Sequence, residues 1–137
     1  MKPTKHEPIR LLIVDSDAQV GRALIRLLRS ADDIEVIATA ADEKAALDLA
    51  VRLQPDVALV DAGAVRMDGM AITRTLRQQV PKTQVVMLSV YATFRSQALA
   101  AGACRFLLKD CSRDELVAAI RLAVRGQCQT NGEEAAD

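Results

Sequence analysis

Four reactive side chains stand directly after short apolar runs in this sequence: Asp15, Asp61, Ser89 and Lys109. If each run is a strand of one parallel sheet, the four meet at its carboxyl edge, where ligands bind in open α/β folds. Carboxylates are ligands for a hard divalent cation, and an ammonium group beside a hydroxyl suits a phosphoryl group. The order of these residues therefore predicts a pocket for a metal ion and a phosphoryl group.

Each of these residues also has a purely structural explanation. An aspartate after a strand, such as Asp61, commonly bonds its own backbone in a turn; the functional alternative is a nucleophile that accepts a phosphoryl group. In the segment 15–17 (Asp-Ser-Asp) every residue type is a good helix N-cap, and we expect one of them to cap. The serine and the lysine are weak signals individually, so the information lies in the order of the whole set.

The hydrophobic pattern predicts five strands and five helices in strict alternation. The strands are expected at 9–14, 34–38, 57–60, 85–88 and 104–108, and the helices at about 18–30, 42–53, 69–79, 92–101 and 112–126. Asp42 and Ser112 are expected N-caps, and Gly102 ends the fourth helix. This alternation predicts an all-parallel sheet with helices on both faces. Asp15 and Asp61 then lie on adjacent strands if the strand order is 2-1-3-4-5.

Composition narrows the class of protein. The 137 residues fit one domain, and eighteen basic residues balance eighteen acidic ones, which argues against nucleic-acid binding by this chain. No apolar stretch is long enough to span a membrane, and the start lacks a signal-peptide core, so we expect a cytoplasmic protein. Three cysteines without C-x-x-C spacing and a single histidine, His6, do not allow a His/Cys metal site. The simple interpretation of the cysteines is a reducing compartment, in which they are small buried or surface residues.

Five motifs together resemble those of a known family: Leu11–Asp15, Pro55–Asp61, Met67–Met70, Ala100–Ala103 and Phe106–Asp110. The chain resembles the receiver domain of bacterial two-component response regulators over residues 9–126, most of all receivers of the NarL/FixJ type. The resemblance implies a flavodoxin-like, doubly wound (βα)5 fold with a five-stranded parallel sheet of order 2-1-3-4-5. Residues 1–8 are then a polar N-terminal segment and residues 127–137 a disordered tail, and we expect no output domain in this chain.

The same resemblance implies a phosphorylation switch rather than an enzyme. Asp61 corresponds to the phosphoacceptor, which takes its phosphoryl group from a histidine kinase or a phosphotransfer protein. Lys109 corresponds to the lysine that pairs with phosphoaspartate, and Ser89 to the switch hydroxyl that bonds a phosphoryl oxygen. Phe106 occupies the switch aromatic position. The fourth helix, fifth strand and fifth helix form the expected signalling face, through which a homodimer is possible.

The resemblance also implies a Mg2+ site and a weakness in it. Asp15, Asp61 and the backbone carbonyl of Gly63 are the expected ligands. The family usually has a second acid after the first strand, where this chain has Ser16, so we expect lower Mg2+ affinity. Asp17 could replace that acid only if its side chain did not point along the next turn.

Three other functions compete with a stand-alone, phosphorylated receiver. Ser16, and Val65 where the family usually has a proline, favour a pseudo-receiver that binds partners independently of phosphorylation. The chain could also be the receiver half of a DNA-binding regulator, although its short acidic end looks like a natural terminus. An independent enzyme of this architecture is the least favoured, because no glycine-rich phosphate loop or flavin-stacking aromatic follows the strands.

Overall fold

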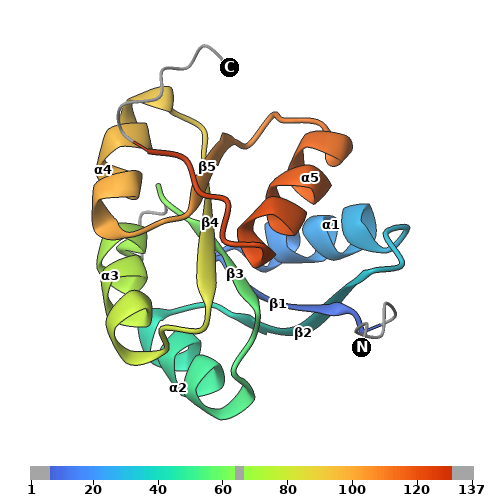
Figure 1. Cartoon of the computed structure of the whole chain (residues 1–137), viewed down its shortest axis with the longest axis horizontal. Coiled ribbons are helices and arrows are strands. Elements are labelled where there is room, and N and C mark those ends of the chain that lie inside the picture. Colours follow the sequence, from blue (N-terminus) through green and yellow to red (C-terminus); the bar gives the residue numbers. More distant parts are fainter. Residues whose placement is uncertain (1–6, 64–66, 131–137) are drawn as a thin grey trace.

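The computed structural model describes residues 7–63 and 67–130, which form a five-stranded parallel sheet between two layers of helices (Figure 1). The sheet order is β2-β1-β3-β4-β5, which confirms the predicted fold class. The strands are β1 (Ile9–Val14), β2 (Ile34–Ala40), β3 (Val57–Asp61), β4 (Gln84–Ser89) and β5 (Arg105–Leu108). The helices are α1 (Ala18–Leu28), α2 (Glu43–Leu53), α3 (Gly69–Gln79), α4 (Arg95–Ala101) and α5 (Arg113–Val124). Helices α1 and α5 cover one face of the sheet, and α2, α3 and α4 cover the other.

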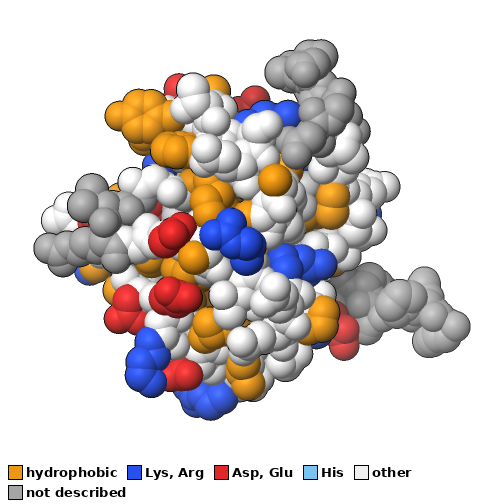
Figure 2. Space-filling view, turned by 90° about the vertical axis from the view of Figure 1, so that its left-hand side faces the viewer, with side chains coloured by type: hydrophobic (Ala, Val, Ile, Leu, Met, Phe, Trp, Pro, Cys, Tyr) orange, Lys and Arg blue, Asp and Glu red, His pale blue; other side chains and the backbone are white. Residues whose placement is uncertain are grey.

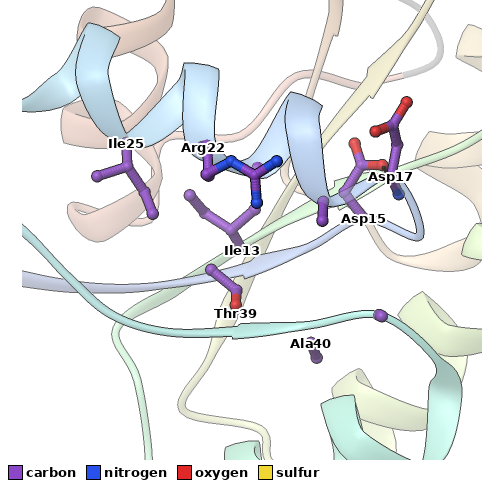
Figure 3. A pocket seen from close by; sticks show the side chains of 10 residues that line it. Ile13, Asp15, Asp17, Arg22, Ile25, Thr39 and Ala40 are labelled. Atoms are coloured by element: carbon purple, nitrogen blue, oxygen red, sulfur yellow. Dashed lines mark hydrogen bonds between the residues drawn. The ribbon is translucent and has the colours of Figure 1, made fainter.

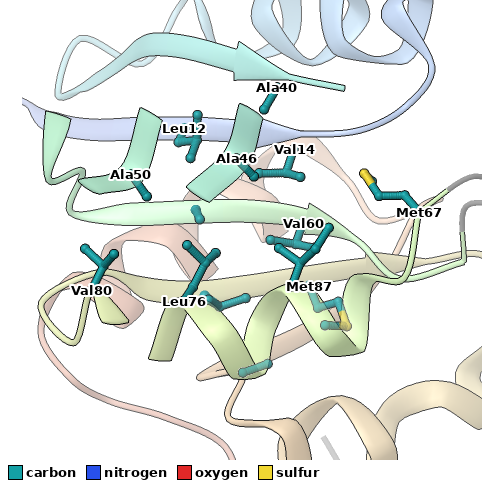
Figure 4. Packing of buried hydrophobic residues seen from close by; sticks show 14 of the residues in the cluster. Leu12, Val14, Ala40, Ala46, Ala50, Val60, Met67, Leu76, Val80 and Met87 are labelled. Atoms are coloured by element: carbon teal, nitrogen blue, oxygen red, sulfur yellow. The ribbon is translucent and has the colours of Figure 1, made fainter. Parts of the chain in front are cut away.

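Two hydrophobic cores fill the space between the sheet and these layers. Side chains alternate along β1, so that Leu12 and Val14 enter the core under α2 and α3, whereas Leu11 and Ile13 enter the core under α1 and α5. Figure 4 shows the first of these cores, in which Met67 and Met87 lie. A sheet buried on both faces explains why its strands are continuous apolar runs.

Side-chain caps fix where most helices begin. Asp17, Asp42 and Asp68 accept backbone N–H bonds at the starts of α1, α2 and α3, and Ser112 forms a capping box with Glu115 at α5. The predicted fourth helix (92–101) differs, since residues 92–94 form a 3-10 turn without a side-chain cap before α4 begins. Among the described residues, no helix is long and apolar enough to cross a membrane.

The chain after α5 departs from the prediction of a disordered tail that starts at residue 127. Gly126 adopts a φ of 75°, which returns the chain toward β5, and residues 127–130 lie along that strand. Cys104 and Cys128 form a disulfide there, so our interpretation of the cysteines as isolated buried or surface residues was wrong for these two. Residues 131–137 lie outside the described part of the chain.

Candidate functional site

Two carboxylates and an ammonium group meet at the carboxyl edge of the sheet. The Lys109 Nζ atom lies 3.2 Å from Asp61 Oδ1 and 3.7 Å from Asp15 Oδ2. Asp15 and Asp61 are 7% and 6% exposed, and Ser89 at the end of β4 is fully buried. The structure therefore brings together residues that are 94 positions apart in the sequence.

Strand register produces this convergence. Val14 pairs with Val60, so the next residue of each chain segment, Asp15 or Asp61, lies at the same end of the adjacent strands β1 and β3. On the other side, the Lys109 N–H donates to the Ser89 carbonyl at 2.8 Å and continues the pairing of β5 with β4. Because parallel strands share one direction, each side chain that follows a strand end is delivered to the same edge.

The loop after β3 holds the Asp61 carboxylate. The Gly63 N–H donates to Asp61 Oδ1 at 3.1 Å, which is the turn bond that the structural explanation expected. The Asp61 carboxylate makes this turn bond and also faces Lys109. The start of α3 also approaches this loop, because a Cβ on Gly69 would overlap the Asp61 carbonyl oxygen and lie 2.9 Å from the Ala62 Cα. Only glycine fits at position 69, a constraint that the sequence analysis missed although its motif included this residue.

The Ser89 hydroxyl is hydrogen-bonded to the backbone of the loop after β4. It accepts a bond from the Tyr91 N–H at 3.0 Å and lies 3.3 Å from the Tyr91 carbonyl oxygen, to which it donates. A Cβ on Gly63 would stand 4.0 Å from the Ser89 Oγ, so the serine borders the loop after β3. Phe106 is 5% exposed and packs in the core on the α4 side. Sequence reasoning gave no signal for the Tyr91 contact, because it joins a side chain to backbone atoms.

The electrostatics of the site favour a cation. Burial raises the pKa of Asp15, and the neighbouring Asp61 charge raises it further. The hydrogen bond from the Asp17 N–H and the positive charge of Lys109 lower this pKa, but the net shift is upward. A divalent cation would relieve the cost of ionising Asp15 beside Asp61. The described residues hold no cluster of three or more His, Cys, Asp or Glu ligands. Two carboxylates nevertheless fit Mg2+, which commonly uses one or two of them with phosphate oxygens and water.

The neighbouring acid, Asp17, serves as the N-cap of α1. Its Oδ1 atom accepts bonds from the Gln19 N–H at 2.9 Å and the Val20 N–H at 3.4 Å, and thereby caps α1. Figure 3 shows Asp17 beside Asp15 at the mouth of a pocket of about 150 Å³ that lies between α1 and β2. Ser16 is half-buried between them. Val65, where the family usually has a proline, lies outside the described residues.

The fold and this acidic edge define a class of signalling domain, and comparisons with known proteins identify it. The family described as response regulator receiver domain matches residues 11–121. The chain is 32% identical to the transcriptional regulatory protein MctR of Rhizobium johnstonii over 125 residues, which covers 90% of this chain and 58% of MctR. It is 37% identical to a protein-glutamate methylesterase/protein-glutamine glutaminase of Symbiobacterium thermophilum, covering 90% of this chain and 37% of that protein.

Solved structures agree with these sequence matches. The signal receiver domain of the putative response regulator NarL from Mycobacterium tuberculosis superposes with a TM-score of 0.80 at 33% identity, over 88% of this chain and 98% of that domain. The chain belongs to the response regulator receiver family, a regulatory domain of two-component signalling, as its motifs predicted. It spans about half the length of the curated transcriptional regulators that it matches.

Proposed function

We propose that Asp61 is the phosphoacceptor of this receiver. The observation that carries the proposal is the contact of Lys109 with two buried carboxylates at the carboxyl edge of the sheet. A carboxylate oxygen of Asp61 attacks the phosphorus of a phosphohistidine on a histidine kinase or phosphotransfer protein. The new P–O bond forms as the P–N bond breaks, the electron pair returns to the imidazole, and Asp61 becomes an acyl phosphate.

The surrounding side chains stabilise that product. Lys109 already lies 3.2 Å from Asp61 Oδ1 and can pair with the added negative charge. The Ser89 hydroxyl leaves the Tyr91 backbone and donates to a phosphoryl oxygen instead. This movement changes the packing beside Phe106, and the signal reaches the face formed by α4, β5 and α5.

Asp15, Asp61 and the Gly63 carbonyl would hold Mg2+ in this pocket. When bound, the ion offsets the negative charge of the phosphoryl group and of the two carboxylates. Ser16 supplies no carboxylate, and Asp17 caps α1, so the ion has fewer anionic ligands than in the usual family pattern. We therefore expect weak binding that improves when phosphate oxygens complete the coordination.

Partners are expected to be proteins of the cytoplasm. A histidine kinase or phosphotransfer protein would dock near the phosphoacceptor, and a second copy of the chain would use the α4-β5-α5 face. Figure 2 shows acidic and basic side chains interspersed on one face of the molecule, and the chain has zero net charge. This mixed charge supports a protein partner over direct contact with nucleic acid.

Amide NMR with Mg2+, before and after addition of the phosphoryl mimic beryllofluoride, tests this proposal. We expect saturable shifts around Asp61, Ser89 and Lys109 that spread to Phe106 and α5. In parallel, Asp61→Asn should abolish Mg2+-dependent labelling by a small phosphoryl donor, while the exposed Asp110→Asn control should keep it. Labelling of Asp61→Asn at the wild-type rate would overturn the assignment.

One observation favours a second candidate, a pseudo-receiver that binds partners without phosphorylation. With Ser16 where the family usually has an acid and Asp17 capping α1, the proposed metal site has one carboxylate fewer than the family pattern. No shift with beryllofluoride at high Mg2+ would select this alternative. If the chain is instead the receiver portion of a longer DNA-binding regulator, as its partial coverage of MctR permits, the same switch would control an output domain.

A further inference from the structure

A disulfide ties the segment that leaves α5 to the start of β5. Cys104, which immediately precedes β5, is 1% exposed, whereas Cys128 lies after α5 and is an exposed residue. Cys111 is the remaining free cysteine. In Figure 1 the red segment after α5 turns back and runs beside β5. The bond therefore joins a core position to a surface segment.

Residues 127–130, called the strap below, cover the outer edge of β5. The Gln129 N–H donates to the Cys104 carbonyl at 2.8 Å, and the Phe106 N–H donates to Gln129 Oε1 at 2.8 Å. An Arg105 Nη1–H also donates to the Gln127 carbonyl at 2.7 Å. Since β5 is the last strand in the sheet, the two Gln129 bonds satisfy backbone groups at an edge that would otherwise be open to pairing.

The strap buries little of its side-chain surface. Its side chains other than Cys128 are two glutamines and a threonine, and only Gln129 is half-buried. Water competes for the hydrogen bonds that join the strap to Cys104, Arg105 and Phe106, and the entropy of ordering the four residues opposes them. The disulfide is the covalent link between the strap and the start of β5.

We propose that Cys104–Cys128 is a reversible redox site whose reduction by a thiol or dithiol releases the strap. A thiolate of the reductant attacks the exposed Cys128 Sγ and forms a mixed disulfide. The Cys104–Cys128 bond breaks, and Cys104 leaves as a thiolate that takes up a proton. A second thiol of the reductant then displaces Cys128, so the reductant ends as a disulfide and the protein gains two electrons and two protons.

The position of the strap makes this chemistry regulatory. In a cytosolic protein a disulfide is usually transient or redox-sensing, not a permanent staple. Gln129 bonds Phe106 directly and, with Phe106, Arg95 and Cys111, lines a groove of about 480 Å³. Release of the strap would reshape the face through which the receiver is proposed to signal, and this step of the inference rests on the proposed function.

Amide hydrogen exchange of the unphosphorylated full chain, with and without dithiothreitol, tests the redox site. The Phe106 amide should exchange at least tenfold faster after reduction, while the Leu59 amide in the central strand should not change. In protein oxidised with glutathione disulfide, alkylation under native conditions should label one free thiol. After reduction it should label more than one thiol. Three free thiols in the oxidised sample, or an unchanged Phe106 rate after reduction, would overturn the proposal.

Variants separate the strap from general destabilisation. Cys128→Ser should show the fast Phe106 exchange with or without dithiothreitol, whereas the control Cys111→Ser should keep the full response. Should Cys128→Ser fail to fold, Gln129→Ala provides the second test, because it keeps the disulfide but removes the bond to Phe106 and should accelerate exchange in oxidised protein.

The redox site and the phosphoacceptor can fail independently. Asp61→Asn should respond to dithiothreitol as the wild type does, because the strap is bonded to Cys104, Arg105 and Phe106 at the start of β5, whereas Asp61 ends β3. Loss of phosphate uptake in wild-type protein with an intact redox response would refute only the proposed function. Normal phosphate uptake without a redox response would refute only the redox site.

Discussion

Replacing Lys109 with methionine should destabilise the protein in Mg2+-free buffer, because the lysine neutralises two buried carboxylates. At an effective dielectric constant of about 20, unit charges at separations of 3.2 and 3.7 Å attract by roughly 5 and 4 kcal/mol. Desolvation and side-chain ordering offset most of that gross attraction. Since the lysine side chain is only 26% exposed, we expect a net loss near the upper range for charged hydrogen bonds, about 2–3 kcal/mol.

Thermal and urea unfolding without divalent cations measure this loss. For a domain of this size, about 2 kcal/mol corresponds to a fall in Tm of roughly 6–10 °C. Mg2+ should narrow the gap between variant and wild type, because an ion bound by the native carboxylates supplies the missing charge and stabilises by mass action.

A matched control exists on the surface of α2. Lys44 lies 3.5 Å from Asp48, and the two side chains are 86% and 64% exposed, so Lys44→Met should change the free energy of unfolding by less than about 0.5 kcal/mol. Equal and small losses for the two methionine variants would refute the reasoning that Lys109 compensates buried charge.

Three further substitutions test the same region. Asp15→Asn should raise the free energy of unfolding at pH 7, because burial raises the folded-state pKa of Asp15 and ionising this carboxyl above pH 3.8 therefore destabilises the folded state. The stability gained by the asparagine variant should vanish as the pH falls below 3.8, where the carboxyl is protonated in both states. Gly69→Ala should cost about 1–3 kcal/mol by overpacking and should slow phosphate uptake, because its Cβ collides with the Asp61 backbone. Gly21→Ala should instead stabilise α1 by up to about 1 kcal/mol, since its Cβ would meet nothing within 4 Å. Urea unfolding curves, recorded for Asp15→Asn over a range of pH, measure the stability changes of all three variants.

Local sequence determined the elements of this fold, because a helix or strand depends mostly on residues a few positions apart. The apolar runs fixed β1 at 9–14, and Ser112 with Glu115 fixed the start of α5. The alternation of these elements was enough to predict a parallel sheet and to place Asp15, Asp61, Ser89 and Lys109 at its carboxyl edge. The start of α4 was harder to predict from the sequence, because no side-chain cap marks it.

Only the tertiary structure decided which atoms meet. The contacts of Lys109 with two carboxylates depend on the register of four strands, which no local pattern contains. The approach of Gly69 to Asp61 depends on how α3 packs beneath the loop after β3. The pairing of Cys104 with Cys128 depends on the return of the chain at Gly126, so counting cysteines could not predict it. Sequence alone thus specified the strands and the chemical groups at their ends, whereas the distances between those groups arose from packing between distant segments.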